Sequence, residues 1–137
     1  SPTPRQPRDL VVDRTAVEAA LQNGQVQLIN ALSPQQFAGH GGAHYGRPGR
    51  IPDSLNLPAR DMVDLNTGRF WAPATLREKV AAAGISLDKP SIHYCGGGIA
   101  ATTSAFVMHL LGATDWALYD NSLLEWSNRA DCPMVCS

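Results

Sequence analysis

The chain has 137 residues, of which 44 % are hydrophobic and 17 % are charged, and its formal net charge is −1. This length corresponds to one ordinary domain, and the apolar fraction is sufficient for a core without disulfides or a metal. The 11 basic and 12 acidic side chains are well mixed, so the chain has no basic field that would hold nucleic acid or an anionic membrane.

The first half of the chain alternates short apolar runs with capped helical patterns. Residues 1–9 contain three prolines and no apolar pattern, which predicts a flexible arm or linker before a single domain over residues 10–137. Asp13 or Thr15 is expected to cap the first helix, and Ser33-Pro34 to begin the second. The patterns predict strands over 10–12, 26–30 and 54–58 and helices over 16–24 and 33–39.

Residues 39–50 differ from their surroundings, because five glycines, one proline and two arginines occur together there. Such a composition predicts a long exposed loop. Two interpretations stay open: the glycines make this loop a mobile lid, or the loop is a tolerated insertion.

The second half continues the alternation and indicates the fold class. Residues 61–73 are predicted to form a loop with one helical turn. The patterns then predict helices over 73–84, 99–112 and 122–129 and strands over 89–95 and 115–120. Strands that alternate with helices predict an α/β fold, in which a mostly parallel sheet carries helices on both faces and the crossovers are right-handed.

Cys95 ends one of these predicted strands and is followed by three glycines that lead into a helix. In parallel sheets ligands bind beyond the carboxyl ends of the strands, where this residue lies. A helix N-terminus stabilises a thiolate relative to a thiol, and glycines allow successive N–H groups to converge on one anion. The pattern therefore indicates a nucleophilic thiol, although a buried structural cysteine beside a flexible turn stays an alternative.

Two known families place a cysteine at this point of an α/β domain. Cys-dependent phosphatases and arsenate reductases need an arginine six positions after the cysteine to grip the oxyanion, and here that position is Ala101. This makes the phosphatase or arsenate reductase interpretation remote. The four histidines and three cysteines show no metal-ligand spacing, so we expect no metal site.

The other family is the rhodanese-like sulfurtransferases, which the chain resembles over roughly residues 10–134. The loop "CGGGIAAT" resembles the neutral loop of the 3-mercaptopyruvate branch, and "GRIPDSLNLP" resembles the family signature "GHIPGSVNLP". "LYDNSLLEW" resembles "YDGSWSEW", and "LINALSPQQFAG" stands where the family has "LIDARSPEEF.G". The opening "RDLVVD" resembles the start of the second, catalytic domain of tandem rhodaneses. The resemblance implies a rhodanese-like three-layer fold.

The resemblance also implies partners and a mechanism that requires no metal or organic cofactor. Cys95 would attack the sulfane sulfur of thiosulfate or 3-mercaptopyruvate and hold it as a persulfide until a thiol or cyanide acceptor removes it. The persulfide would be bound by the loop residues Gly96, Gly97, Gly98, Ile99 and Ala100. A second rhodanese-like domain or a protein sulfur acceptor is a further expected partner, whereas nucleic acid and membrane are not. The absence of a visible export signal favours a cytoplasmic location, although a cleaved signal would leave no trace.

The chain departs from the family where the substrate is gripped. The usual Asp-x-Arg is replaced by Asn30, Ala31 and Leu32, the "GRF" triplet by "QQF", and the hydroxyl two positions after the cysteine by Gly97. Arg47, Arg50 or Arg60 could supply the anion contact, or they are plain surface arginines. The lost charges favour the alternative that the chain is a non-catalytic rhodanese-like binding or regulatory module.

Three further side chains have open roles. His93 precedes the nucleophile by two residues and therefore faces the same side of the strand, either under the loop or as a packed core histidine. Cys132 and Cys136 could pair with each other, or one could resolve a persulfide on Cys95. The simpler interpretation is that they are incidental thiols on a frayed chain end.

Overall fold

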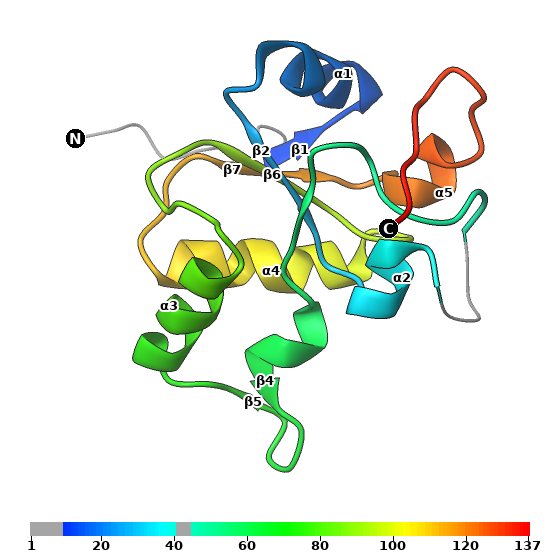
Figure 1. Ribbon diagram of the computed structural model, residues 1–137. Helices are drawn as coiled ribbons and strands as arrows, with labels where there is room; N and C mark the ends of the chain where they lie inside the picture. Colours follow the sequence, from blue (N-terminus) through cyan, green and yellow to red (C-terminus); the bar gives the residue numbers. More distant parts are fainter. Residues whose placement is uncertain (1–9, 41–44) are drawn as a thin grey trace.

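A central parallel sheet organises the molecule (Figure 1). The computed structural model describes residues 10–40 and 45–137, so the predicted arm over 1–9 lies outside the described residues. The five strands are ordered β1 (Val11–Val12), β7 (Trp116–Tyr119), β6 (Ser91–Tyr94), β2 (Gln27–Asn30) and β3 (Leu55–Asn56). All four neighbouring pairs run parallel, which places the carboxyl ends of the strands at one edge.

Helices cover both faces of this sheet, as the alternation predicted. The helices are α1 (Arg14–Asn23), α2 (Pro34–Ala38), α3 (Pro73–Ala82), α4 (Ile99–Leu110) and α5 (Ser122–Trp126). One core cluster contains side chains of α1 and α5, and the other contains side chains of α3 and α4, among them Leu76, Val80, Val107 and Met108. The expected α/β three-layer class, a mostly parallel sheet with helices on both faces, is confirmed.

Local caps fix the ends of the early helices. The side chain of Asp13 accepts a hydrogen bond from the N–H of Ala16 at 3.1 Å, and Gly24 ends α1 in the left-handed conformation. Asp13 is thus the N-cap, and Thr15 is not, because it already lies inside the helix. Ser33 caps α2 in the same way, by accepting from the N–H of Gln36.

Residues 59–73 contain more structure than the predicted loop with one turn. A 3₁₀ helix, η2 (Ala59–Met62), leads into a small antiparallel hairpin of β4 (Val63–Asp64) and β5 (Arg69–Phe70). Gly68, with φ +73°, closes the hairpin turn, and the ring of Phe70 packs 5.5 Å from that of Phe106 on α4. The prediction missed these two-residue strands because they are too short to show periodicity.

The C-terminal segment is packed, so the expectation of a frayed end is wrong. Val135 and Arg50 exchange two backbone hydrogen bonds, of 2.9 and 2.8 Å, as an isolated antiparallel bridge. The N–H of Ser137 donates to the carbonyl of Ala38, which brings the chain end beside α2 (Figure 1). This segment also carries Cys132, which is buried, and Cys136, which is exposed; both are free thiols.

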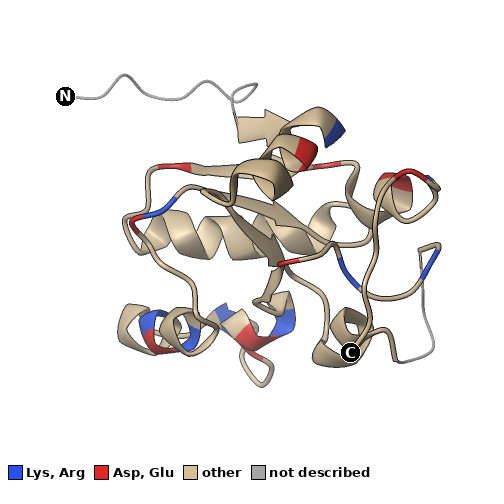
Figure 2. Cartoon of the chain, turned by 45° about the horizontal axis from the view of Figure 1, so that its top comes forward, with Lys and Arg blue, Asp and Glu red and all other residues tan. Residues whose placement is uncertain are grey.

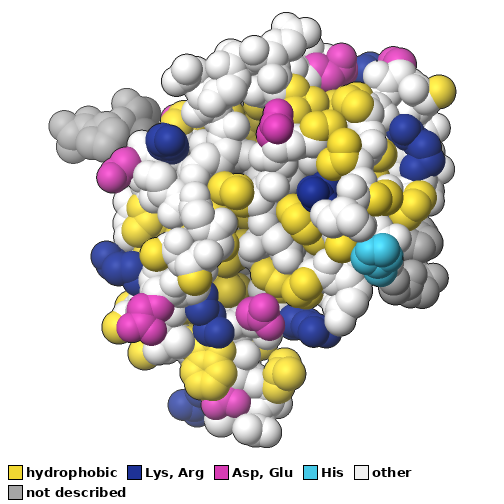
Figure 3. All heavy atoms as spheres, viewed as in Figure 1, with side chains coloured by type: hydrophobic (Ala, Val, Ile, Leu, Met, Phe, Trp, Pro, Cys, Tyr) yellow, Lys and Arg dark blue, Asp and Glu magenta, His cyan; other side chains and the backbone are white. Residues whose placement is uncertain are grey.

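Charge is dispersed over the molecule. Lys and Arg alternate with Asp and Glu along the chain, and α4 carries neither sign (Figure 2). On the face shown in Figure 3, basic and acidic side chains are interspersed with small apolar patches. Within residues 10–40 and 45–137, no helix has the length and apolarity to cross a membrane, and no three His, Cys, Asp or Glu side chains gather as a metal site.

Candidate active site

Cys95 lies between β6 and α4, at the carboxyl edge of the sheet. Its side chain is almost fully buried, and the N–H of Gly98 donates to Sγ at 3.0 Å. Helix α4 begins at Ile99, and its N-cap is Gly98, which has no side chain that could bind the N–H groups of the first turn. The sulfur therefore sits where backbone N–H groups and the helix dipole stabilise negative charge.

Helix α5 holds the other side of this loop. The N–H groups of Leu123 and Leu124 donate to the carbonyls of Cys95 and Gly96, at 3.0 and 2.9 Å. The N–H of Cys95 donates to Oγ of Ser122, whose φ of +51° places it in the left-handed region. Because α5 binds these carbonyls, the loop is fixed with the Gly98 N–H directed to the sulfur.

The three glycines of the loop have three different environments. Gly98 has φ +100°, and a Cβ there would lie 2.8 Å from the carbonyl oxygen of Asp120. A Cβ on Gly96 would overlap the ring of Tyr45, although its φ lies outside the left-handed region. Gly97 is exposed and has open space around it. Backbone conformation thus requires glycine at 98, whereas a neighbouring side chain requires it at 96.

Of the predicted loop, Gly98 directs its N–H to the sulfur, and a binding role for Gly96, Gly97, Ile99 and Ala100 stays a prediction. The predicted arginines are engaged elsewhere or exposed. Arg50 donates through Nη1 to the carbonyl of Phe37 and to Oγ of Ser137, and its guanidinium lies 4.4 Å from the Phe37 ring centre. Arg60 is exposed on η2. A contact from either arginine to a substrate anion stays a prediction. Ile99, the first residue of α4, is 88 % exposed beside the loop.

The residues that replace the family's Asp-x-Arg line the end of β2. Asn30 is fully buried, and its Oδ1 accepts from the N–H of Leu32 at 2.8 Å, while its Nδ2 has no hydrogen-bond partner among the described residues. Next to it, the hydroxyl of Tyr94 accepts from the N–H of Ile51, and burial raises the pKa of this phenol. This end of the sheet therefore carries no formal charge from β2.

His93 is a core residue and not a part of the loop. One ring nitrogen lies 3.1 Å from Oγ of Ser91 and the other 2.8 Å from Oγ of Ser104 on α4. Burial lowers its pKa to about 3, so the ring is neutral at physiological pH. The packed-core interpretation of His93 is confirmed.

Residues 13–129 match the model of the rhodanese-like domain family. The chain belongs to this family. The match covers most of the chain and includes the strand, loop and helix that carry Cys95.

Curated relatives of this rhodanese-like chain are sulfurtransferases. It is 31 % identical to the 3-mercaptopyruvate sulfurtransferase of Escherichia coli strain K12 over 92 % of its own length and 45 % of that protein. It is 36 % identical to the mitochondrial thiosulfate/3-mercaptopyruvate sulfurtransferase 1 of Arabidopsis thaliana, over 64 % of its length and 23 % of that protein. The chain therefore spans less than half the length of these relatives.

The fold also recurs in a solved structure. The anaerobic ergothioneine biosynthesis enzyme from Chlorobium limicola, in complex with trimethyl histidine, superposes with a TM-score of 0.83 at 22 % identity. That superposition covers 100 % of this chain and 34 % of the enzyme. At this identity the likeness establishes the shared fold alone.

Two residues of the site were not predicted as such. Oγ of Ser122 accepts a hydrogen bond from the N–H of Cys95. The sequence offered only a weak indication of this role, which is that Ser122 lies in the "LYDNSLLEW" motif. Tyr45 lies against Gly96; the lid interpretation of residues 39–50 was a signal for this segment, but it did not single out Tyr45.

Proposed function

We propose that the chain is a sulfurtransferase that carries a sulfane sulfur on Cys95 as a persulfide. The observation that supports this most directly is the hydrogen bond from the Gly98 N–H to Sγ at the uncapped start of α4. A persulfide formed on Cys95 extends the sulfur by one atom, and its charge stays beside the same N–H groups. The family and the names of the curated relatives agree with this chemistry.

The reaction has two half-reactions that balance. The Cys95 thiolate attacks the outer sulfur of the donor, the donor's bond to that sulfur breaks, and its electron pair leaves with sulfite from thiosulfate or with the enolate of pyruvate from 3-mercaptopyruvate, which then takes up a proton. A thiol or cyanide acceptor next attacks the outer sulfur of the persulfide, which returns the Cys95 thiolate. In this chain Cys95 supplies the nucleophile and Gly98 the N–H that faces it.

The test is the intact mass of the reduced protein after incubation with thiosulfate and, separately, with 3-mercaptopyruvate. We expect a gain of one sulfur, about 32 Da, that cyanide removes and that Cys95→Ser abolishes. Cys136→Ser is the matched control, because Cys136 is the exposed thiol and should not be needed for the gain. Folded protein that gains no sulfur from either donor would overturn the proposal.

A non-catalytic binding module is the second candidate, and one observation favours it. Leu32 stands where the family usually has an arginine, and Arg50 already donates to Phe37 and Ser137. The two candidates differ in the reactivity of the thiol. Alkylation of Cys95 at a lower pH than an ordinary thiol supports the enzyme, whereas ordinary reactivity without sulfur loading supports the module.

A further inference from the structure

The ring of Tyr45 lies directly on the sulfur-bearing loop. The space that a Cβ on Gly96 would occupy is taken by the Cζ end of this ring, which bears the hydroxyl. Gly96 is buried, while Tyr45 keeps 38 % of its surface exposed. The ring therefore forms part of the wall between the neighbour of Cys95 and solvent.

Tyr45 is held in this place by the segment that follows α5. The Nδ2 of Asn128 donates to the carbonyl of Tyr45 at 2.8 Å, and the N–H of Arg47 donates to the carbonyl of Ser127 at 3.3 Å. Gly46, between them, approaches Ser127 and Asn128 so closely that a Cβ would overlap both side chains. The backbone from the carbonyl of Tyr45 to the N–H of Arg47 is thus fixed to one segment, residues 127–128.

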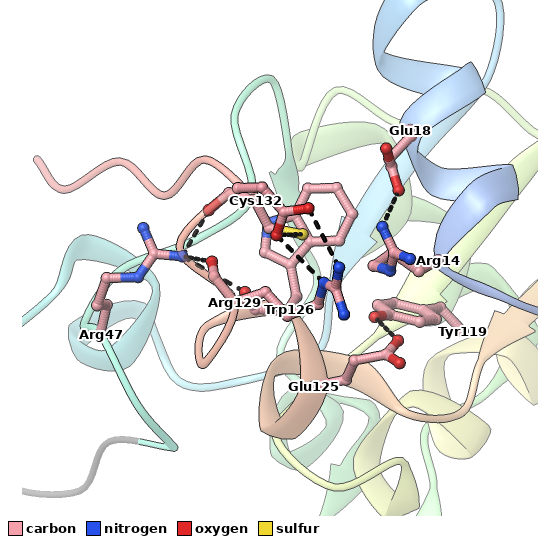
Figure 4. A network of polar contacts seen from close by, with 9 residues as sticks. Arg14, Glu18, Arg47, Tyr119, Glu125, Trp126, Arg129 and Cys132 are labelled. Atoms are coloured by element: carbon pink, nitrogen blue, oxygen red, sulfur yellow. Dashed lines mark hydrogen bonds and ion pairs between the residues drawn. The ribbon is translucent and has the colours of Figure 1, made fainter.

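The guanidinium of Arg47 adds a second attachment (Figure 4). It donates to the carbonyls of Ser127, Arg129 and Cys132 at 3.0, 2.6 and 2.5 Å. Charge-assisted bonds to several carbonyls hold a backbone more firmly than a single neutral bond does. Arg47 is therefore a positioning residue for the Tyr45 segment.

The Tyr45 ring is also closely packed away from the loop. It lines a hollow of about 10 Å³ together with Leu32, Leu123 and residues of its own segment such as Pro48 and Gly49. This volume corresponds to about one water molecule. The ring therefore has little room to move away from Gly96 on that side.

We propose that Tyr45 is a specificity-determining residue, whose ring restricts the Cys95 sulfur to small donors and acceptors. This inference rests on the proposed sulfurtransferase function, because it names the size class of the molecules that exchange sulfur there. The selection is steric: the ring occupies the space beside Gly96, and the hollow that it lines elsewhere has room for about one water molecule. A compact acceptor such as cyanide passes the ring, whereas a bulky thiol such as glutathione meets it.

The first test compares two acceptors on the persulfide-loaded protein. The quantity compared is the rate constant for sulfur transfer to glutathione divided by that for transfer to cyanide. We expect Tyr45→Ala to raise this ratio about tenfold, a typical size for a steric effect in a pocket. Tyr45→Phe should retain the wild-type ratio, since it keeps the ring and removes only the hydroxyl. An unchanged ratio in Tyr45→Ala, or an equal change in Tyr45→Phe, would overturn the proposal.

The second test is a double-mutant cycle with Gly96→Ala. The new methyl group cannot coexist with the ring, so this variant should displace Tyr45 and shift the ratio in the same direction as Tyr45→Ala. The double variant Gly96→Ala/Tyr45→Ala should then show little further change, because the two substitutions remove the same obstacle. Independent, additive shifts would contradict contact between the ring and the loop as the cause.

A third test needs no sulfur transfer and separates this proposal from the proposed function. Cys95 is alkylated with iodoacetamide or with a bulky fluorescein maleimide, and peptide mapping by mass spectrometry distinguishes it from Cys132 and Cys136. Tyr45→Ala should accelerate the bulky reagent about tenfold more than the small one, with Tyr45→Phe as the matched control. Equal acceleration of both reagents would overturn the wall even if persulfide forms. A larger acceleration of the bulky reagent than of the small one would support the steric role of Tyr45 even if no persulfide forms.

Discussion

Two glycine-containing segments meet at the candidate site, and they use glycine for the same local reason. In residues 96–98, Gly98 has φ +100° and lies against the carbonyl of Asp120; in residues 45–50, Gly49 has φ +101° and lies against the carbonyl of Val135. The segments differ in what they contact. The first directs an N–H group to the sulfur of Cys95, and the second pairs with Val135 in the C-terminal segment. In both places glycine is required because another backbone segment approaches closely and φ is positive, and not because the chain must be flexible there.

The largest effect is expected for Gly98→Ala. Left-handed strain, together with a Cβ 2.8 Å from the Asp120 carbonyl, should cost about 2–3 kcal/mol of unfolding free energy. Movement of the Gly98 N–H away from Sγ should also slow persulfide formation about 100-fold. Urea unfolding and the rate of the mass gain measure the two effects. Persulfide formation at the wild-type rate would contradict the assigned role of this N–H.

The corresponding change in the other segment, Gly49→Ala, should separate stability from chemistry. We expect a loss of about 2 kcal/mol in urea unfolding, because the carbonyl of Val135 must move, but a much smaller effect on persulfide formation than Gly98→Ala produces. Gly68→Ala is the matched control, since Gly68 has φ +73° with open space around it. If Gly68→Ala costs as much, strain alone accounts for the loss and packing against Val135 is irrelevant.

A smaller effect is expected where the second segment is attached by its side chain. Arg47→Ala should lower the unfolding free energy by about 1–2 kcal/mol, because the carbonyls of Ser127, Arg129 and Cys132 lose a shared donor at a partly exposed site. Arg47→Lys should recover only part of this, since an ammonium lacks the planar fork. Full recovery by lysine would show that charge, and not the fork geometry, holds the segment.

The smallest effect is expected for Gly97→Ala. Gly97 lies in the first segment, but a side chain at this position would have no close neighbour among the described residues. Its Cβ would enter open space and its φ is outside the left-handed region, so the unfolding free energy should change by less than about 0.5 kcal/mol. Urea unfolding beside Gly98→Ala measures the contrast. A loss comparable to that of Gly98→Ala would mean that the loop requires glycine throughout.

The sequence contained enough information for the central sheet and for the place of Cys95 at its carboxyl edge. Caps such as Asp13 and Ser33, and apolar runs such as that over β6, act through near neighbours, and they predicted the order of strands and helices correctly. The position of Cys95 then followed from where a strand leads into a helix. Family motifs supported the same conclusion independently.

The parts that could not be predicted depend on contacts between distant residues. Tyr45 and Gly96 are fifty-one positions apart, and Arg47 binds carbonyls some eighty positions further along. Every residue has a backbone carbonyl, so the sequence does not indicate which carbonyls will accept these hydrogen bonds. Neither the position of the Tyr45 ring nor the packing of the C-terminal segment could therefore be predicted. The β4–β5 hairpin was missed for a different reason, which is the shortness of its strands.

The attachment of the Tyr45 segment to residues 127–132, which follow the loop in the sequence, has a consequence for biosynthesis. A ribosome makes the loop 95–98 before it makes Asn128, Arg129 and Cys132, which hold Tyr45 and Arg47 in place. The loop of the nascent chain therefore lacks its aromatic wall until residues 127–132 have emerged from the exit tunnel. On the proposed role of Tyr45, the size restriction at Cys95 is thus acquired after the sheet and the loop 95–98 have been synthesised.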